Sequence, residues 1–213
     1  MADSSTSPHT TAAPTGAVAP GVDVEMWSPP SDRVDAVGSD PLRILFVGGD
    51  LRRKGGDLLL SVADELRGDP SIPAFEVHLC TTADIEDQPG VVIHRGLTAN
   101  SPELIEQYHL ADIFCLPTLG DCLPMVLAEA GAAGLPLVST DVGAISGIVR
   151  DGQTGHLIEP RSDVQLAEAL RHLLTDGAAR QAYGAAAREL IRSEHDAAKN
   201  AGRIIEVLRA AAH

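Results

Sequence analysis

The strongest candidate for ligand chemistry is a run of glycines and cations at residues 48–56, GGDLRRKGG. Gly48 and Gly49 let a ligand approach the backbone closely, and a following helix would direct free N–H groups at an anion. Arg53 and Lys54 concentrate positive charge in a chain of formal net charge −14. The run predicts a phosphate-binding loop, although a solvated basic turn explains the composition equally well. It fits neither the P-loop motif nor the G-x-G-x-x-G dinucleotide fingerprint.

Two carboxylates form a second candidate. Asp121 follows an apolar run, and Glu129 is the only charged residue between Cys122 and Thr140. A carboxylate on an apolar helix must find hydrogen-bond partners or stay protonated. Ligand hydroxyl groups and buried backbone N–H groups both meet that need, and we favour the ligand hydroxyls.

Weaker candidates follow two other apolar runs. His94, Gly96 and Leu97 are in a position to line a pocket for a base or a sugar, although a lone histidine at a strand end is more often structural. Asp141 and Gly143 suit either close approach of a ligand or simple turn chemistry.

Composition excludes several classes of function. The chain has 16 basic and 30 acidic residues, so general binding to nucleic acid or to an anionic membrane surface is not expected. Aromatic residues make up 3%, too few for base-stacking platforms. Three cysteines without a C-x-x-C pair favour a reducing cytoplasm, and no apolar run is long enough to span a membrane. The scattered histidines predict no metal site.

Short apolar runs alternate with helical patterns in the order typical of a parallel sheet covered on both faces. The predicted strands are residues 42–47, 75–80, 91–94, 112–117, 136–139 and 154–159. We therefore expect an α/β fold with a single Rossmann-like, doubly wound sheet of about six strands and a helical C-terminus. The candidate residues then follow the carboxyl ends of strands, where such sheets bind ligands.

Three segments of the chain differ in amino-acid composition. Residues 1–20 are rich in Ser, Thr, Ala and Pro and predict a disordered tail. Residues 21–41 hold three prolines and Trp27, and predict an irregular, linker-like segment that packs through the tryptophan. Residues 42–213 form the predicted Rossmann-like domain.

Taken together, these motifs resemble the donor-binding, C-terminal domain of a family 4 glycosyltransferase, a retaining enzyme of the GT-B type. The resemblance runs from about Val18 to the C-terminus. Its landmarks are residues 19–29, 46–56, 110–118, 121–140 and 151–155. It implies that residues 42–213 bind a nucleotide diphosphate sugar.

The resemblance also implies roles for individual residues. Lys54 holds the diphosphate, and Arg53 substitutes for a family arginine whose position is Gly49 here. Asp121 contacts the donor sugar, and Glu129 the ribose hydroxyls. The backbone of the next segment faces the sugar and the phosphates; its residues are Cys122, Leu123, Pro124 and Met125.

The implied reaction is loss of a nucleoside diphosphate with retention at the anomeric carbon. Lys54, Arg53 and helix N–H groups would stabilise the leaving phosphate, with Asp121 beside them, so neither a metal nor a cofactor is expected. The family has a separate acceptor domain, and residues 19–29 resemble the linker to it. We therefore expect an acceptor-domain subunit or self-association, and little transfer by this chain alone. A split enzyme and a truncated gene product both fit.

Two alternatives remain at this point. The first is a non-catalytic nucleotide-sugar-binding or regulatory module, which the departures at Gly49 and Asp121 favour. The second is an epimerase or phosphorylase on the same fold, although the sequence shows no lysine motif for a pyridoxal cofactor.

Overall fold

The computed structural model describes residues 20–29 and 41–211. Six strands form one sheet in the order β3-β2-β1-β4-β5-β6, and every neighbouring pair is parallel. The strands are β1 (Leu42–Val47), β2 (Phe75–Cys80), β3 (Val91–His94), β4 (Ile113–Leu116), β5 (Leu137–Thr140) and β6 (Gly155–Ile158). The predicted Rossmann-like sheet is therefore confirmed, with each strand within a residue of its predicted place.

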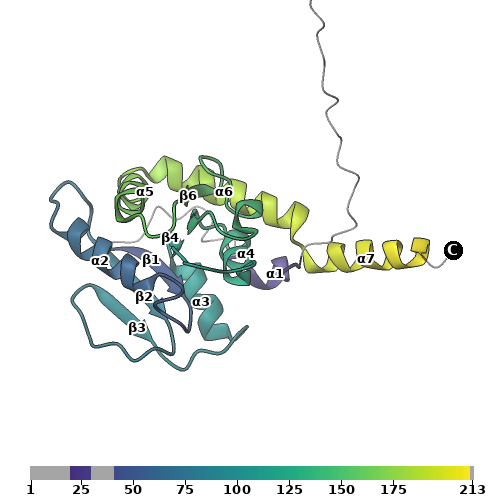
Figure 1. Ribbon diagram of the computed structural model, residues 1–213, viewed down its shortest axis with the longest axis horizontal. Coiled ribbons are helices and arrows are strands. Elements are labelled where there is room, and N and C mark those ends of the chain that lie inside the picture. Colours follow the sequence, from purple (N-terminus) through teal and green to yellow (C-terminus); the bar gives the residue numbers. More distant parts are fainter. Residues whose placement is uncertain (1–19, 30–40, 212–213) are drawn as a thin grey trace, which may run out of the picture.

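One helix precedes the sheet, others connect β1 to β2, β3 to β4 and β4 to β5, and the rest follow β6 (Figure 1). They are α1 (Val24–Trp27), α2 (Gly56–Arg67), α3 (Pro102–Leu110), α4 (Met125–Ala132), α5 (Asp163–Thr175), α6 (Gly177–Glu194) and α7 (Ala197–Ala211), with a 3-10 turn at Ile145–Gly147. The predicted start of α3 is confirmed, since Ser101 accepts a hydrogen bond from the N–H of Leu104 and Pro102 lies in the first turn.

The helices cover both faces of the sheet, as successive residues of a strand show. Phe46 of β1 lies against Gly56 of α2, and α2 packs against α5. The preceding residue, Leu45, pairs with Phe114 of β4, and Phe114 stacks on Tyr108 of α3. Because neighbouring side chains of a strand point to opposite faces, α2 and α3 lie on opposite sides of the sheet.

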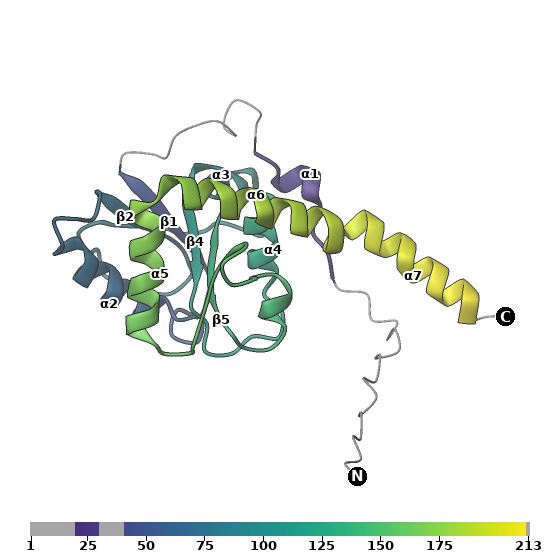
Figure 2. The same ribbon diagram turned by 90° about the horizontal axis from the view of Figure 1, so that it is seen from above.

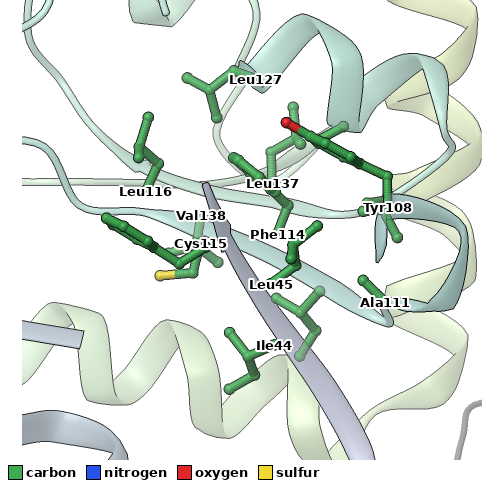
Figure 3. Close-up of a cluster of buried hydrophobic side chains, with 14 of the residues drawn as sticks. Ile44, Leu45, Tyr108, Ala111, Phe114, Cys115, Leu116, Leu127, Leu137 and Val138 are labelled. Atoms are coloured by element: carbon green, nitrogen blue, oxygen red, sulfur yellow. The ribbon is translucent and has the colours of Figure 1, made fainter. Parts of the chain in front are cut away.

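The core between these layers is mostly aliphatic, as the composition predicts, with a few aromatic rings among the Leu, Ile, Val and Ala side chains. Leu45, Phe114 and Leu137 come from three adjacent strands and lie beneath Tyr108 (Figure 3). All four are completely buried. This packing fixes the strand ends from which the candidate residues follow.

The segment before the sheet is tied to the end of the domain. Val22 forms an isolated parallel bridge with Asp196, and its N–H donates to the carbonyl of His195 at 2.9 Å. Trp27 is 2% exposed, and α1 packs against α4. The expected packing through Trp27 is thus seen, but the expected irregular backbone is wrong at α1, because the Asp23 carboxylate caps one helical turn. The predicted tail, except for Pro20, and residues 30–40 of the predicted linker-like segment lie outside the described residues.

Helix α7 projects from the body of the domain (Figures 1 and 2). It exposes Ile204, Ile205 and Leu208, the last of these by 64%. Among the residues that the structure describes, no helix combines the length and the apolar character needed to cross a membrane.

Candidate functional site

The candidate site lies where the strand order reverses, between β1 and β4. Such a switch point opens a crevice outside the carboxyl ends of the two strands. The loop after β1 supplies Lys54, and the loop after β4 supplies Asp121. The sequence motifs that we singled out therefore meet at one edge of the sheet.

Backbone contacts hold the two loops together. The carbonyl of Arg53 accepts hydrogen bonds from the N–H of Leu119 at 2.8 Å and from the hydroxyl of Thr118 at 3.1 Å. Gly55 has a φ of +76°, and a β-carbon there would lie 2.0 Å from the carbonyl oxygen of Pro117. Only glycine satisfies both the backbone conformation and the close approach.

A pocket of about 340 Å³ opens at this edge of the sheet. Its lining residues come from the ends of β1, β2 and β3, the loops that follow them, and helices α3 and α4. They are Val47, Gly48, Gly49, Lys54, Cys80, Thr81, Thr82, His94, Leu97, Ala99, Leu104, Val126 and Glu129. Six of the residues predicted from the sequence thus line one cavity: Gly48, Gly49, Lys54, His94, Leu97 and Glu129.

Lys54, which lines this pocket, forms an ion pair. Its Nζ donates a hydrogen bond to Oδ2 of Asp121, and each side chain is 15% exposed. The pair places a cation that lines the cavity beside an anion that does not. Lys54 is therefore held near the place where an anionic ligand would bind, with Asp121 competing for it.

Arg53 lies outside the pocket lining. Its Nη1 donates to the carbonyl of Gly120 at 3.0 Å, its Nε donates to Asp50 at 3.2 Å, and its side chain is 50% exposed. Nη1 is 3.9 Å from Oδ2 of Asp121. In this arrangement Arg53 braces the two loops.

Glu129 lines the pocket from α4 and has a buried partner behind it. The hydroxyl of Tyr108 donates a hydrogen bond of 2.7 Å to Oε2 of Glu129. Burial raises the pKa of Glu129 above its ordinary value, and the Tyr108 hydrogen bond acts in the opposite direction. Burial raises the pKa of Tyr108 well above its usual range, with the Glu129 charge adding to the effect.

His94 lines the pocket from β3 and pairs with a second histidine. Its Nε2 lies 3.0 Å from Nδ1 of His78 on β2, and the rings stack with centroids 5.2 Å apart. Nε2 of His78 in turn lies 3.3 Å from Oε2 of Glu76. Burial lowers the pKa of both histidines.

The remaining predicted residues do not line the pocket. Gly96 and the segment Cys122–Met125 are among these. The carbonyl of Cys122 accepts a hydrogen bond from Ala144 at 2.9 Å. Gly143 (φ +59°) admits the backbone of Asp121, since a β-carbon there would lie 2.2 Å from its carbonyl oxygen. The close approach expected at Gly143 is thus that of the protein's own loop.

Sequence reasoning placed the loop after Cys80 at the ligand-binding edge but did not single out its residues. Thr81 and Thr82 line the pocket directly after β2, and Thr82 lies beside Gly49. Two consecutive hydroxyl residues after a buried apolar strand were the signal available. No group of three or more His, Cys, Asp or Glu side chains in the described part of the chain is arranged to hold a metal ion.

The fold is that of the Rossmann-like domains of GT-B glycosyltransferases. The family of glycosyl transferases group 1 matches residues 41–176, and the chain belongs to that family.

Three similar proteins illustrate the relationship. D-inositol 3-phosphate glycosyltransferase of Corynebacterium diphtheriae is 32% identical over 193 residues, covering 81% of this chain and 45% of the relative. Anabaena HepE, solved in complex with UDP-glucose, has a TM-score of 0.73 at 16% identity over 89% of this chain and 56% of its own. The C-terminal domain of a group 1 glycosyl transferase (LpcC) of Francisella tularensis has a TM-score of 0.67 at 20% identity, covering 82% and 98%. The chain thus spans about half the length of the curated relatives it matches.

Proposed function

We propose that this domain binds a nucleotide diphosphate sugar and serves as the donor-binding half of a retaining glycosyltransferase of family 4. The observation that carries the proposal is the pocket at the switch point, lined by both Lys54 and Glu129. A cation and a partly buried carboxylate in one cavity match the phosphates and the ribose of a nucleotide. Family membership and the solved complex of Anabaena HepE with UDP-glucose support this ligand class.

The lining suggests one orientation for the ligand. The diphosphate would lie against Gly48, Gly49 and Lys54, where backbone and cation meet. The ribose hydroxyls would donate to Glu129. The base would occupy the end formed by His94 and Leu97, with the apolar side chains of Ala99 and Leu104. The donor sugar would then face the rim, where Asp121 lies beside Lys54.

In this proposal Lys54 acts on the leaving group. As the bond between the anomeric carbon and the phosphate oxygen breaks, negative charge grows on the diphosphate, and a positioned cation stabilises it. The N-terminus of α4, which has no side-chain cap, would add the positive end of the helix dipole to this field. Asp121 would hold the sugar. Arg53 would act indirectly, by holding the loop in place through its hydrogen bonds to Asp50 and Gly120. No metal or cofactor is required by this scheme.

A sugar acceptor needs a site of its own beside the anomeric carbon. We propose that a separate acceptor-binding domain supplies it, with self-association of this chain as the second possibility. Relatives about twice as long as the matched segment support the first. The names of those relatives favour transfer over a non-catalytic binding module. A cytoplasmic location fits a nucleotide-sugar substrate and the unpaired cysteines.

The proposal is tested by titrating the full chain with uridine, guanosine and adenosine diphosphates in a calorimeter, followed by the sugar derivatives of the tightest binder. We expect micromolar binding of at least one nucleotide, and Glu129→Gln should weaken it. The native protein should bind the 2′,3′-dideoxy form of that nucleotide as weakly as the Glu129→Gln variant binds the ribonucleotide. Each change removes the proposed contact between the ribose hydroxyls and the Glu129 carboxylate. A native chain that binds none of the three nucleotides contradicts the proposed function.

A further inference from the structure

We infer that Tyr108 is a positioning residue for nucleotide binding: its hydroxyl holds one oxygen of Glu129 so that the other faces the pocket for the ribose hydroxyls. This inference rests on the proposed function, because it explains how Glu129 is held in its role there. Tyr108 itself is absent from the pocket lining and is completely buried on α3.

The phenol ring is fixed by two aromatic neighbours. Trp27 meets it edge-on, with ring centroids 4.9 Å apart and planes at 69°. Phe114 stacks beneath it at 5.7 Å with planes at 12° (Figure 3). Rotation of the Tyr108 ring would break both contacts in a closely packed core. The hydroxyl therefore stays at one place, 2.7 Å from Oε2 of Glu129.

The carboxylate has capacity left for a ligand. An ionised carboxylate offers about four lone-pair sites, and the Tyr108 hydroxyl takes one of them on Oε2. Within the described part of the chain, Tyr108 is the only side-chain hydrogen-bond partner that Glu129 has. Two adjacent ribose hydroxyls are donors of matching number. Because Tyr108 restrains the side chain beforehand, less rotamer entropy is lost when a ligand binds.

The other titratable groups that line the pocket leave the stabilisation of ionised Glu129 to Tyr108. Lys54, His94 and Cys80 line the same pocket from the β1–α2 loop, β3 and β2. Lys54 is bonded to Asp121, burial lowers the pKa of His94, and burial raises the pKa of Cys80 to about 12. Near neutral pH the histidine and the thiol are therefore uncharged. The Tyr108 hydrogen bond favours the ionised form of Glu129, against the effect of burial.

The test uses Tyr108→Phe in the full chain, because phenylalanine keeps the ring packing and removes only the hydroxyl. The probes are the tightest-binding of uridine, guanosine and adenosine diphosphate, and its 2′,3′-dideoxy analogue. We expect the variant to bind the ribonucleotide about tenfold more weakly and the dideoxy analogue unchanged. On the acidic side of the pH profile, the pH at which ribonucleotide binding falls to half should move upward, because Glu129 loses the hydrogen bond that favours its ionised form. Tyr183→Phe is the matched control, since Tyr183 packs on His156 and His172, away from the pocket.

Each outcome separates the inference from the proposed function. If native protein discriminates the two probes and Tyr108→Phe keeps both the discrimination and the pH midpoint, the inference is overturned and the proposed function stands. If the native chain binds none of the three diphosphates, the proposed function fails and the inference fails with it.

If Tyr108→Phe does not fold, 3-fluorotyrosine in the Tyr183→Phe background labels Tyr108 alone. The stronger donor should then move the pH midpoint downward, and an unchanged midpoint overturns the inference.

Discussion

Substituting Lys54 and Asp121 should change nucleoside diphosphate affinity in opposite directions. The two side chains are hydrogen-bonded to each other and are each 15% exposed, so solvent weakens their electrostatic effects only in part. A diphosphate entering the pocket must share Nζ with Asp121. The ammonium group has three protons, so one bond to the aspartate leaves two for phosphate oxygens.

Lys54→Ala removes these charge-assisted bonds and leaves Asp121 facing the phosphates. Such a bond contributes about 1.5–3 kcal/mol, and the uncompensated aspartate places the expected loss near the upper end. This corresponds to a loss of affinity of about 10- to 150-fold. Asp121→Asn removes the competing anion instead, so free nucleoside diphosphate should bind more tightly by about 0.5–1 kcal/mol. For the sugar nucleotide that gain should be offset by loss of the proposed contact between Asp121 and the sugar.

Isothermal titration calorimetry of both variants with nucleoside diphosphate and with nucleotide sugar checks these signs. Lys199→Ala is a matched control, because this lysine lies on α7 and bonds to the carbonyl of Arg192 at 2.7 Å. Arg53→Ala should have a smaller effect than Lys54→Ala, since Arg53 does not line the pocket. Unchanged affinity in Lys54→Ala, or weaker diphosphate binding in Asp121→Asn, would refute the reasoning.

Two further predictions concern stability. Gly55→Ala and Gly96→Ala introduce a side chain at nearly the same positive φ, +76° and +75°, but only at Gly55 does the β-carbon meet backbone, the carbonyl of Pro117. Chemical denaturation should show a loss of about 1 kcal/mol for Gly96→Ala and several-fold more for Gly55→Ala; equal losses would contradict the contact. Burial lowers the pKa of His78 and His94 from 6.5, so the unfolded chain binds more protons below that pH, and the free energy of unfolding should fall as the pH drops from about 7 to 5.5. His78→Gln should flatten this slope, and an unchanged slope would show that the pair does not titrate as expected.

The sheet was predictable because buried parallel strands appear in the sequence as short apolar runs. Residues 42–47 and 75–80 are such runs, and both form strands with those bounds. The α1 turn was not predictable from apolar pattern, because four residues carry too little periodicity. Its signal was the Asp23 cap.

Six of the residues that line the pocket were predictable from the sequence, but the pairings between side chains were not. Lys54 and Asp121 were both identified from the sequence, yet their ion pair spans 67 positions and depends on two loops meeting at the switch point. The Tyr108–Glu129 bond depends on how α3 lies against α4. The contact between His78 and His94 depends on the register of β2 against β3, which places Cys80 beside His94. A single sequence contains no direct record of register or helix packing.

The bridge between Val22 and Asp196 also determines how this domain would respond to tension. The chain enters the fold and leaves its compact part at the same spot, where the N–H of Val22 bonds to His195 at 2.9 Å and the N–H of Ala197 bonds to Val22 at 3.0 Å. A pull applied between residues 20 and 197 would load these hydrogen bonds and the buried Trp27 first. The six strands would carry no force until the bridge had opened. The bridge therefore carries the first load, and because Trp27 packs on Tyr108, whose hydroxyl bonds to Glu129, tension there would reach this wall of the pocket before it reaches the strands.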